Sequence, residues 1–173
     1  SVAEGHAAGA DVVKARLRDA VELGVEELTV YSFSTENWSR SEEEVGALMA
    51  MFAHRIRSET PELHEEGVRM RFIGRRDRIS AELGTLIDDA EALTAANDRS
   101  TLFVAFDYGG RDGILHAAER FDGGTEEDFR ALLYAPDMHD PDLVIRTSGE
   151  QRLSNYLIWQ TAYAELVFAD ELW

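Results

Sequence analysis

The segment IRTSGEQRLSNYLIWQ, at positions 145–160, gathers arginine and serine side chains that suit a phosphate group. Arg146 and Arg152 can each fork onto phosphate oxygens. Ser148, Ser154 and the backbone N–H groups of the glycine-containing turn can complete a phosphate cradle. If Ser154 or the asparagine after it caps a following helix, the N-terminus of that helix adds favourable partial charge. The alternative is a pair of surface arginines that balance nearby acids, and the residue types alone leave both interpretations open.

A second group of polar side chains lies in FSTENWSR, at positions 33–40. Ser34 and Asn37 could orient a substrate proton or a phosphate, while Phe33 and Trp38 could supply an apolar wall. The alternative is an ordinary turn, in which the asparagine and the glutamate before it make local backbone hydrogen bonds.

Two single residues are further candidates for chemistry. Glu165 lies within the apolar stretch YAELVF, where a carboxylate needs a partner, and Mg²⁺ bound to a diphosphate is one candidate. The alternative, an edge glutamate in solvent, is favoured by the residue type alone. His6 precedes a predicted helix and could bind phosphate, although a lone histidine is more often a structural or solvent residue.

Composition limits the classes of protein that fit. The 173 residues are enough for one domain with a real core, which is the expectation here. The net charge of −17 argues against nucleic acid as a partner but allows an anionic ligand in an arginine-bearing pocket. Without cysteine there is no disulfide framework and no thiolate metal site, which favours a reducing compartment. No run of about 18 apolar residues, no signal peptide and no P-loop or G-x-G-x-x-G fingerprint is visible.

The hydrophobic patterns predict strands that alternate with helices. Strands are predicted at 28–33, 68–74, 101–106, 142–147 and 165–168. Helices are predicted at 7–23, after the capping box of Ser41 and Glu44, and at 80–96, 113–120 and near 156–162, with a loop over 120–128. This order predicts an α/β fold with a mostly parallel central sheet flanked by helices.

Three polar clusters follow three of the predicted strands directly. They are STENWSR (34–40), DYGGRDG (107–113) and TSGEQRLSN (147–155). Ligands of open parallel sheets bind beyond the carboxyl ends of the strands. The three clusters are therefore predicted to face one cleft.

Four segments resemble the cis-prenyltransferases, the undecaprenyl diphosphate synthase or isoprenyl transferase family. They are YSFSTENWSR (31–40), DYGGRDGI (107–114), DLVIRTSGEQRLSNYLIWQTAYAEL (142–166) and FADELW (168–173), and the resemblance runs from His6 to Trp173. It implies a parallel sheet flanked by helices, an apolar tunnel and a homodimer. It also implies a Mg²⁺-dependent enzyme that condenses isopentenyl diphosphate onto an allylic diphosphate, such as farnesyl or geranyl diphosphate, to make a cis-polyprenyl diphosphate.

The resemblance also implies roles for individual residues. Arg146, Arg152 and Ser154 match residues that hold the diphosphate of isopentenyl diphosphate, and Glu165 matches a carboxylate that helps to bind Mg²⁺. Asn37 matches a residue implicated in proton removal. The remaining matches are its catalytic neighbours Ser34 and Trp38 and the substrate-binding residues His6, Phe33, Glu36 and Arg40. The helices that follow Ser41 and Ser80 would line the tunnel, and the small Ser32 favours a medium or long product.

The sequence departs from the family's pattern in several places. The aspartate motif DGNGRWA should lie before His6 and is absent, Val2 replaces an expected arginine, and Asp107 replaces the usual asparagine. The stretch between Arg120 and Phe121 is about a dozen or more residues shorter than usual in the family. We expect a chain that lacks its N-terminal strand and C-terminal tail. A cytoplasmic enzyme working near the membrane is the main interpretation, and a non-catalytic partner subunit of the same fold is the alternative.

Overall fold

The structure, a computed structural model, describes residues 14–172. It divides into two compact units, which we describe separately as the N-terminal unit (residues 14–107) and the C-terminal unit (residues 108–172). The expectation of a single domain stays a prediction. None of the helices in the described part of the chain is long and apolar enough to cross a membrane.

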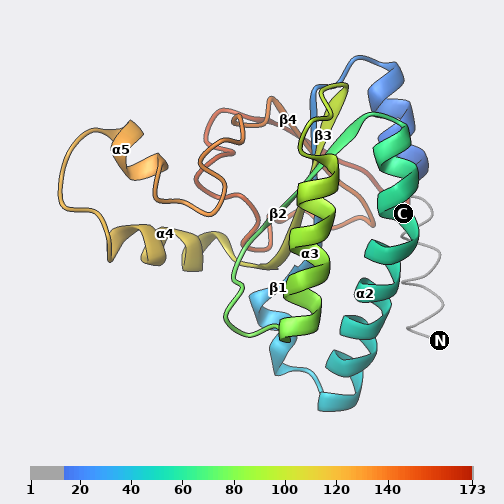
Figure 1. Cartoon of the computed structure of the whole chain (residues 1–173). Helices are drawn as coiled ribbons and strands as arrows, with labels where there is room; N and C mark the ends of the chain where they lie inside the picture. Colours follow the sequence, from blue (N-terminus) through green and yellow to red (C-terminus); the bar gives the residue numbers. More distant parts are fainter. Residues whose placement is uncertain (1–13, 173) are drawn as a thin grey trace. The chain divides into compact units, whose positions relative to one another are not determined.

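The N-terminal unit is built on a three-stranded sheet. Its strands are β1 (Glu27–Ser34), β2 (Val68–Ile73) and β3 (Ser100–Tyr108), in the order β1-β3-β2 (Figure 1). β2 pairs with β3 in parallel, in a register that runs from Val68 opposite Ser100 to Ile73 opposite Ala105. β3 is buried along almost its whole length, as its continuous apolar sequence predicted for a strand covered on both faces.

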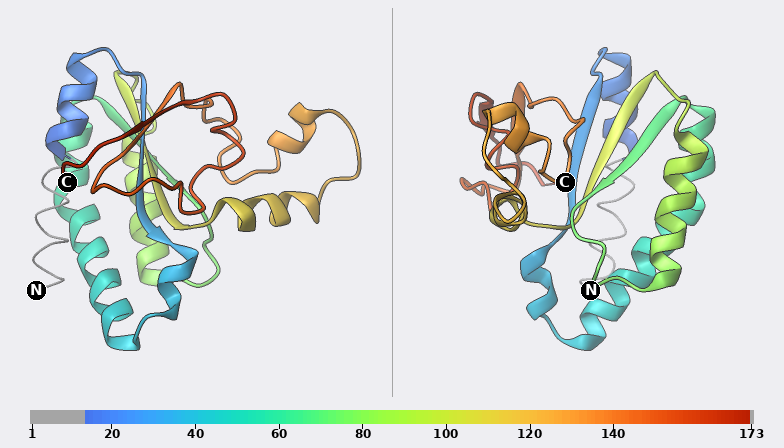
Figure 2. Two further views of the ribbon diagram at one scale, coloured as in Figure 1. Left: turned by 180° about the vertical axis from the view of Figure 1, so that it is seen from behind. Right: turned by 60° about the vertical axis from the view of Figure 1, so that its left-hand side comes forward.

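Two long helices cover one face of this sheet. α2 (Glu42–Glu65) and α3 (Ala81–Thr94) lie side by side against it, as both views of Figure 2 show. The predicted cap of α2 is confirmed, because Ser41 Oγ accepts the N–H of Glu44 at 3.3 Å. Ser80 caps α3 in the same way, since its Oγ accepts the N–H of Leu83 at 3.2 Å. Residues 14–22 are also helical, and the first part of the helix predicted over 7–23 lies outside the described residues.

Aromatic rings join the helices to the sheet. Phe52 of α2 stacks on Phe106 of β3 with ring centroids 3.9 Å apart, and it meets Phe72 of β2 edge-on at 6.0 Å. The ring centroid of Phe33, near the end of β1, lies 5.3 Å from the ring centroid of Phe106 in the same core. Each buried ring of this kind stabilises the fold by roughly 1.5–3 kcal/mol. The apolar sides of α2 and α3 therefore form a packed core with the sheet, and the tunnel stays a prediction.

The outer edge of β2 is closed by side chains of the segment that follows it. Thr94 Oγ1 accepts the N–H of Met70 at 3.0 Å, and Glu91 Oε1 accepts the N–H of Phe72 at 2.7 Å. Asn97 Nδ2 donates to the carbonyl of Val68 at 2.7 Å. These three backbone groups at the edge are therefore satisfied within the chain.

The C-terminal unit contains two short helices and a pair of short strands. They are α4 (Gly110–Ala118), α5 (Glu126–Arg130), β4 (Leu143–Arg146) and β5 (Glu165–Phe168). β4 and β5 pair in parallel, with Leu143 opposite Glu165 and Arg146 opposite Phe168. The strands and their direction confirm the predicted α/β fold class with parallel pairing.

Two predictions for this unit are wrong. The helix predicted near 156–162 does not form, and residues 154–163 are turns and bends, because Ser154, Asn155 and Leu157 have φ angles of 51°, 63° and 44°. A right-handed helix cannot continue through such left-handed residues. The end of the loop predicted over 120–128 is helical instead, because α5 begins at Glu126. Thr125 caps this helix, since its side chain accepts the N–H of Asp128.

Candidate active site

The turn after β1 is a short 3-10 helix, η1 (Thr35–Ser39). Asn37 Oδ1 accepts the N–H of Ser34 at 2.9 Å, and the Asn37 carbonyl accepts the N–H of Arg40 at 3.2 Å. The local turn considered for this segment is therefore present. It fixes the carboxamide of Asn37, and among the described residues no group accepts from its Nδ2, so this amide nitrogen is available to a ligand.

The end of η1 is tied to the end of β3 through a buried carboxylate. Trp38 Nε1 donates to Asp107 Oδ1 at 2.8 Å, and Asp107 is 0% exposed. Arg78 donates from Nε to Asp107 Oδ2 at 3.0 Å and also donates from Nη2 to Oδ1. The guanidinium carbon of Arg78 lies 5.3 Å from the centre of the Trp38 ring, within the range of a cation–π contact.

These contacts bring together residues at the carboxyl ends of β1, β2 and β3, and Asp107 lies within β3 itself. The predicted convergence of the clusters after β1 and β3 is thus present within the N-terminal unit. Sequence reasoning missed Arg78, which lies in the basic run GRRDR directly after β2. The position of that run, at the carboxyl end of a strand, was the signal that could have identified it.

The other predicted residues of this loop differ in exposure. Phe33 is buried and meets Trp38 edge-on, with centroids 5.4 Å apart, so it belongs to the apolar wall at the base of the turn. Glu36 is exposed, and its carboxylate accepts the Thr35 hydroxyl at 3.2 Å. Arg40 is exposed directly after η1.

In the C-terminal unit, the second and third polar clusters are in direct contact. The carbonyl of Asn155 accepts the N–H of Gly110 at 2.7 Å, and its Oδ1 accepts the N–H of Arg111 at 2.8 Å. Asn155 therefore satisfies the first turn of α4 instead of starting a helix of its own. A Cβ on Gly110 would lie 2.6 Å from Cγ1 of Ile158, so a larger residue cannot fit this contact without movement.

Tyr108, in the same motif as Gly110, is buried. Burial raises the pKa of its hydroxyl above the usual 10.0, and a hydrogen bond with Gln160 opposes this shift only in part. The hydroxyl therefore stays neutral, and Tyr108 supports the motif as a packed residue, with Tyr156 edge-on at 6.2 Å.

The loop after β4 is held in place by backbone hydrogen bonds to the segment after β5. The N–H of Ser148 donates to the carbonyl of Glu171 at 2.8 Å, and the N–H of Gly149 donates to the carbonyl of Ala169 at 2.9 Å. Both residues have a φ of 70°. The prediction that backbone N–H groups of this turn complete a phosphate cradle is therefore wrong for these two groups, which already have acceptors.

The side chains of this loop remain accessible to a ligand. Arg152 is 70% exposed and pairs only with Glu150 among the described residues, at 2.6 Å. Such an exposed ion pair contributes about 0–1 kcal/mol, so an incoming diphosphate can replace it. Ser154 is exposed, and Arg146 is half-buried at the end of β4. Their roles in binding a diphosphate stay predictions.

Glu165 begins β5, opposite Leu143, and is exposed. It lies three residues along the register from the Arg146–Phe168 pair, a distance of roughly 10 Å. No group of three or more potential metal-ligating side chains occurs in residues 14–172. Mg²⁺ usually takes one or two protein carboxylates together with phosphates and water, so a single exposed carboxylate fits a Mg²⁺–diphosphate pair. His6 lies outside the described residues.

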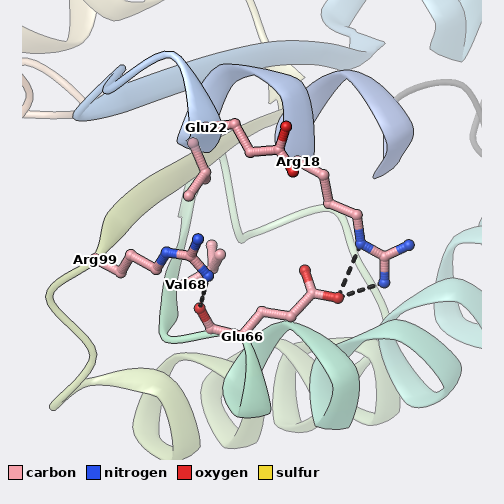
Figure 3. Close-up of a pocket in the computed structure, with 6 residues that line it drawn as sticks. Arg18, Glu22, Glu66, Val68 and Arg99 are labelled. Atoms are coloured by element: carbon pink, nitrogen blue, oxygen red, sulfur yellow. Dashed lines mark hydrogen bonds and ion pairs between the residues drawn. The ribbon is translucent and has the colours of Figure 1, made fainter.

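A pocket is present elsewhere in the N-terminal unit (Figure 3). Arg18 Nε donates to Glu66 Oε1 at 2.9 Å on one side, and Arg99 Nη1 donates to the Glu66 carbonyl at 3.4 Å on the other. Val68, which begins β2, also lines it. The pocket thus lies at the amino end of the strands of this unit, opposite the end that carries Trp38.

Comparisons with known proteins agree on one family. A family model described as "Putative undecaprenyl diphosphate synthase" matches residues 1–173. The chain is 46% identical to isoprenyl transferase 2 of Bradyrhizobium diazoefficiens, over 99% of this chain and 72% of the relative. It is also 46% identical to the isoprenyl transferase of Thermotoga maritima, over 98% of this chain and 77% of the relative.

A solved structure supports the same assignment. The crystal structure of lavandulyl diphosphate synthase from Lavandula x intermedia, in complex with dimethylallyl diphosphate, matches with a TM-score of 0.93 and 34% identity, covering 99% of this chain and 79% of that chain. These comparisons place the chain among the prenyltransferases. It belongs to the undecaprenyl diphosphate synthase family, which confirms the resemblance and the fold class drawn from the sequence.

Proposed function

We propose that this prenyltransferase condenses isopentenyl diphosphate onto an allylic diphosphate, such as farnesyl or geranyl diphosphate, to form a cis-polyprenyl diphosphate. The observation that carries the proposal is the loop after β4, in which Arg152 is 70% exposed on a backbone fixed at Ser148 and Gly149. An otherwise strongly acidic chain thereby presents a guanidinium from a defined position. The lavandulyl diphosphate synthase of the same fold was crystallised with dimethylallyl diphosphate, which is an allylic diphosphate.

In the proposed reaction, the C–O bond of the allylic diphosphate breaks, and inorganic diphosphate leaves with the bonding electron pair. The double bond of isopentenyl diphosphate attacks the allylic carbon and forms the new C–C bond. One proton then passes from the isopentenyl unit to the departing diphosphate, and the new cis double bond forms. Each cycle lengthens the chain by one isopentenyl unit.

The residues of this chain would bind and orient the two diphosphates. Arg146, Arg152 and Ser154 would hold isopentenyl diphosphate through charge-assisted hydrogen bonds. Mg²⁺, when bound with Glu165 to a diphosphate, would neutralise charge on that group and so favour its departure. An amide is not a strong base, and Oδ1 of Asn37 already accepts the N–H of Ser34, so Asn37 would orient a diphosphate oxygen through its Nδ2.

The remaining parts of the proposal concern the setting of the reaction. Ser34, Trp38, Phe33, Glu36 and Arg40 would complete the site on the turn after β1, and His6 would contact the allylic diphosphate. The apolar sides of α2 and α3 would line the space that receives the growing chain. We propose a homodimer in the cytoplasm, near the membrane that would take up a lipid product.

The test is incorporation of labelled isopentenyl diphosphate, with farnesyl or geranyl diphosphate as starter, with and without Mg²⁺. The protein used is the complete gene product, and the organic extract is analysed by mass. Mg²⁺-dependent products that differ by one isopentenyl unit are expected. No incorporation with any allylic starter would contradict the proposal and favour a non-catalytic partner subunit.

A further inference from the structure

We propose that Arg78 is a positioning residue of the candidate active site, an inference that rests on the function proposed above. Its guanidinium holds the buried carboxylate of Asp107, and that carboxylate holds the indole of Trp38. The Arg78 side chain thereby fixes η1 against the carboxyl end of β3.

The three side chains form a closed set of contacts. Trp38 and Arg78 both donate to the carboxylate of Asp107, and the guanidinium of Arg78 also lies 5.3 Å from the centre of the Trp38 ring. Asp107 is 0% exposed, so without Arg78 its charge would be buried and uncompensated. Breaking one partner of a buried ion pair is strongly unfavourable, because the remaining charge has lost both water and its counter-charge.

The loop that carries Arg78 is already held at the end of β3 by its backbone. The N–H of Arg75 donates to the carbonyl of Asp107 at 3.0 Å. Gly74 has a φ of +128°, and a Cβ there would lie 2.1 Å from the carbonyl oxygen of Phe106, so the two segments touch closely. The loop therefore does not need the Arg78 side chain to stay in place. What that side chain adds is the link to Trp38.

The same link ties η1 to a strand that is distant in the sequence. The hydrogen bonds of Asn37 Oδ1 and of the Ser39 hydroxyl stay within the turn, whereas the indole of Trp38 reaches a residue 69 positions away. A turn that carries a ligand-orienting amide must be held closely, since a displacement of about 1 Å can reduce a rate about 100-fold. Arg78 is thus placed to act on the reaction through Trp38 without touching substrate.

The experiment compares Arg78→Gln, the double variant Arg78→Gln/Asp107→Asn and the control Arg76→Gln in the full chain. Arg76 lies two positions before Arg78 and pairs with Asp88 at 3.2 Å and with Glu91, away from Asp107. Hydrogen–deuterium exchange over residues 34–41 is measured without substrate, so it reports on the turn even if no prenyl transfer occurs. Steady-state kcat and KM for isopentenyl diphosphate are measured in parallel.

Arg78→Gln should speed exchange over residues 34–41 roughly tenfold and lower kcat roughly tenfold or more, with KM within about twofold. The double variant should restore the wild-type exchange rate and the wild-type kcat, because the carboxamide introduced by Asp107→Asn would carry no charge while its oxygen still accepts the indole N–H. Arg76→Gln should match the wild type in both measurements.

Two results would overturn the proposal. Unchanged exchange and kcat in Arg78→Gln would show that the turn holds its position without this side chain. A loss of kcat that persists in the double variant, with KM raised, would instead make Arg78 a direct ligand of substrate. If Arg78→Gln does not fold, Trp38→Phe serves in its place, since it leaves Asp107 paired with Arg78. It should speed exchange over the same residues, and unchanged exchange would contradict the proposal.

Discussion

Replacing Arg152 by alanine should separate substrate binding from folding stability. The side chain is 70% exposed, and its partner within the described residues is Glu150 at 2.6 Å. An exposed ion pair of this kind contributes about 0–1 kcal/mol, so Arg152→Ala should lower the free energy of unfolding by less than about 1 kcal/mol.

The effect on the substrate should be much larger. A hydrogen bond between charged groups contributes roughly 1.5–3 kcal/mol, and each 1.4 kcal/mol corresponds to about a factor of ten. The KM for isopentenyl diphosphate should therefore rise roughly 10- to 150-fold in Arg152→Ala. The KM for the allylic starter should stay within about threefold, because the proposed role of Arg152 is confined to isopentenyl diphosphate.

The assay is the initial rate of labelled isopentenyl incorporation, with each substrate varied in turn at saturating Mg²⁺, alongside urea unfolding of both proteins. Arg120→Ala is the matched control, because Arg120 is another exposed arginine of the C-terminal unit and donates only to the carbonyl of His116 among the described residues, at 2.8 Å. The reasoning is refuted if the KM for isopentenyl diphosphate in Arg152→Ala stays within twofold of the control.

Three further predictions follow from the same structure. Glu165→Gln should raise the Mg²⁺ concentration for half-maximal rate roughly tenfold, with unchanged thermal stability because Glu165 is exposed; an unaltered Mg²⁺ titration would remove it from the metal site. Phe52→Ala should lower the free energy of unfolding by about 3 kcal/mol, since it deletes the ring stacked on Phe106 at 3.9 Å, and urea unfolding measures this. Gly74→Ala should destabilise the chain by about 2 kcal/mol or more, because its Cβ would lie 2.1 Å from the Phe106 carbonyl oxygen. Gly46→Ala in α2, where a Cβ meets nothing within 4 Å, should instead stabilise by about 0.5–1 kcal/mol, and equal effects at both glycines would contradict this explanation.

Local signals were sufficient for much of the N-terminal unit. Ser41 with Glu44 predicted the start of α2, and the apolar run 101–106 predicted the buried central strand β3. Both features depend on residues close together in the chain, where spacing and side-chain type determine the outcome. The boundaries of β1 and β2 agree with their predictions to within a residue at each end.

Other features depend on contacts or backbone angles that residue types leave open. The segment after Asn155 has helix-forming residues, yet the left-handed φ angles at Ser154, Asn155 and Leu157 and the contact with Gly110 make it a series of turns. The ion pair of Arg78 joins the loop after β2 to the end of β3, 29 positions further along the chain, and the periodicity of the sequence carries no information about such a pair. The start of α5, by contrast, could have been predicted from the sequence, because Thr125 and the aspartate three positions later form a capping box.

The closed edge of β2 limits where the three-stranded sheet can grow. A strand that arrived beside β2 would find the N–H groups of Met70 and Phe72 already bonded to Thr94 and Glu91. β2 therefore cannot template pairing with another chain at these positions, which protects this edge from strand-to-strand association. Because β3 lies between β1 and β2, any additional strand must join the sheet beside β1.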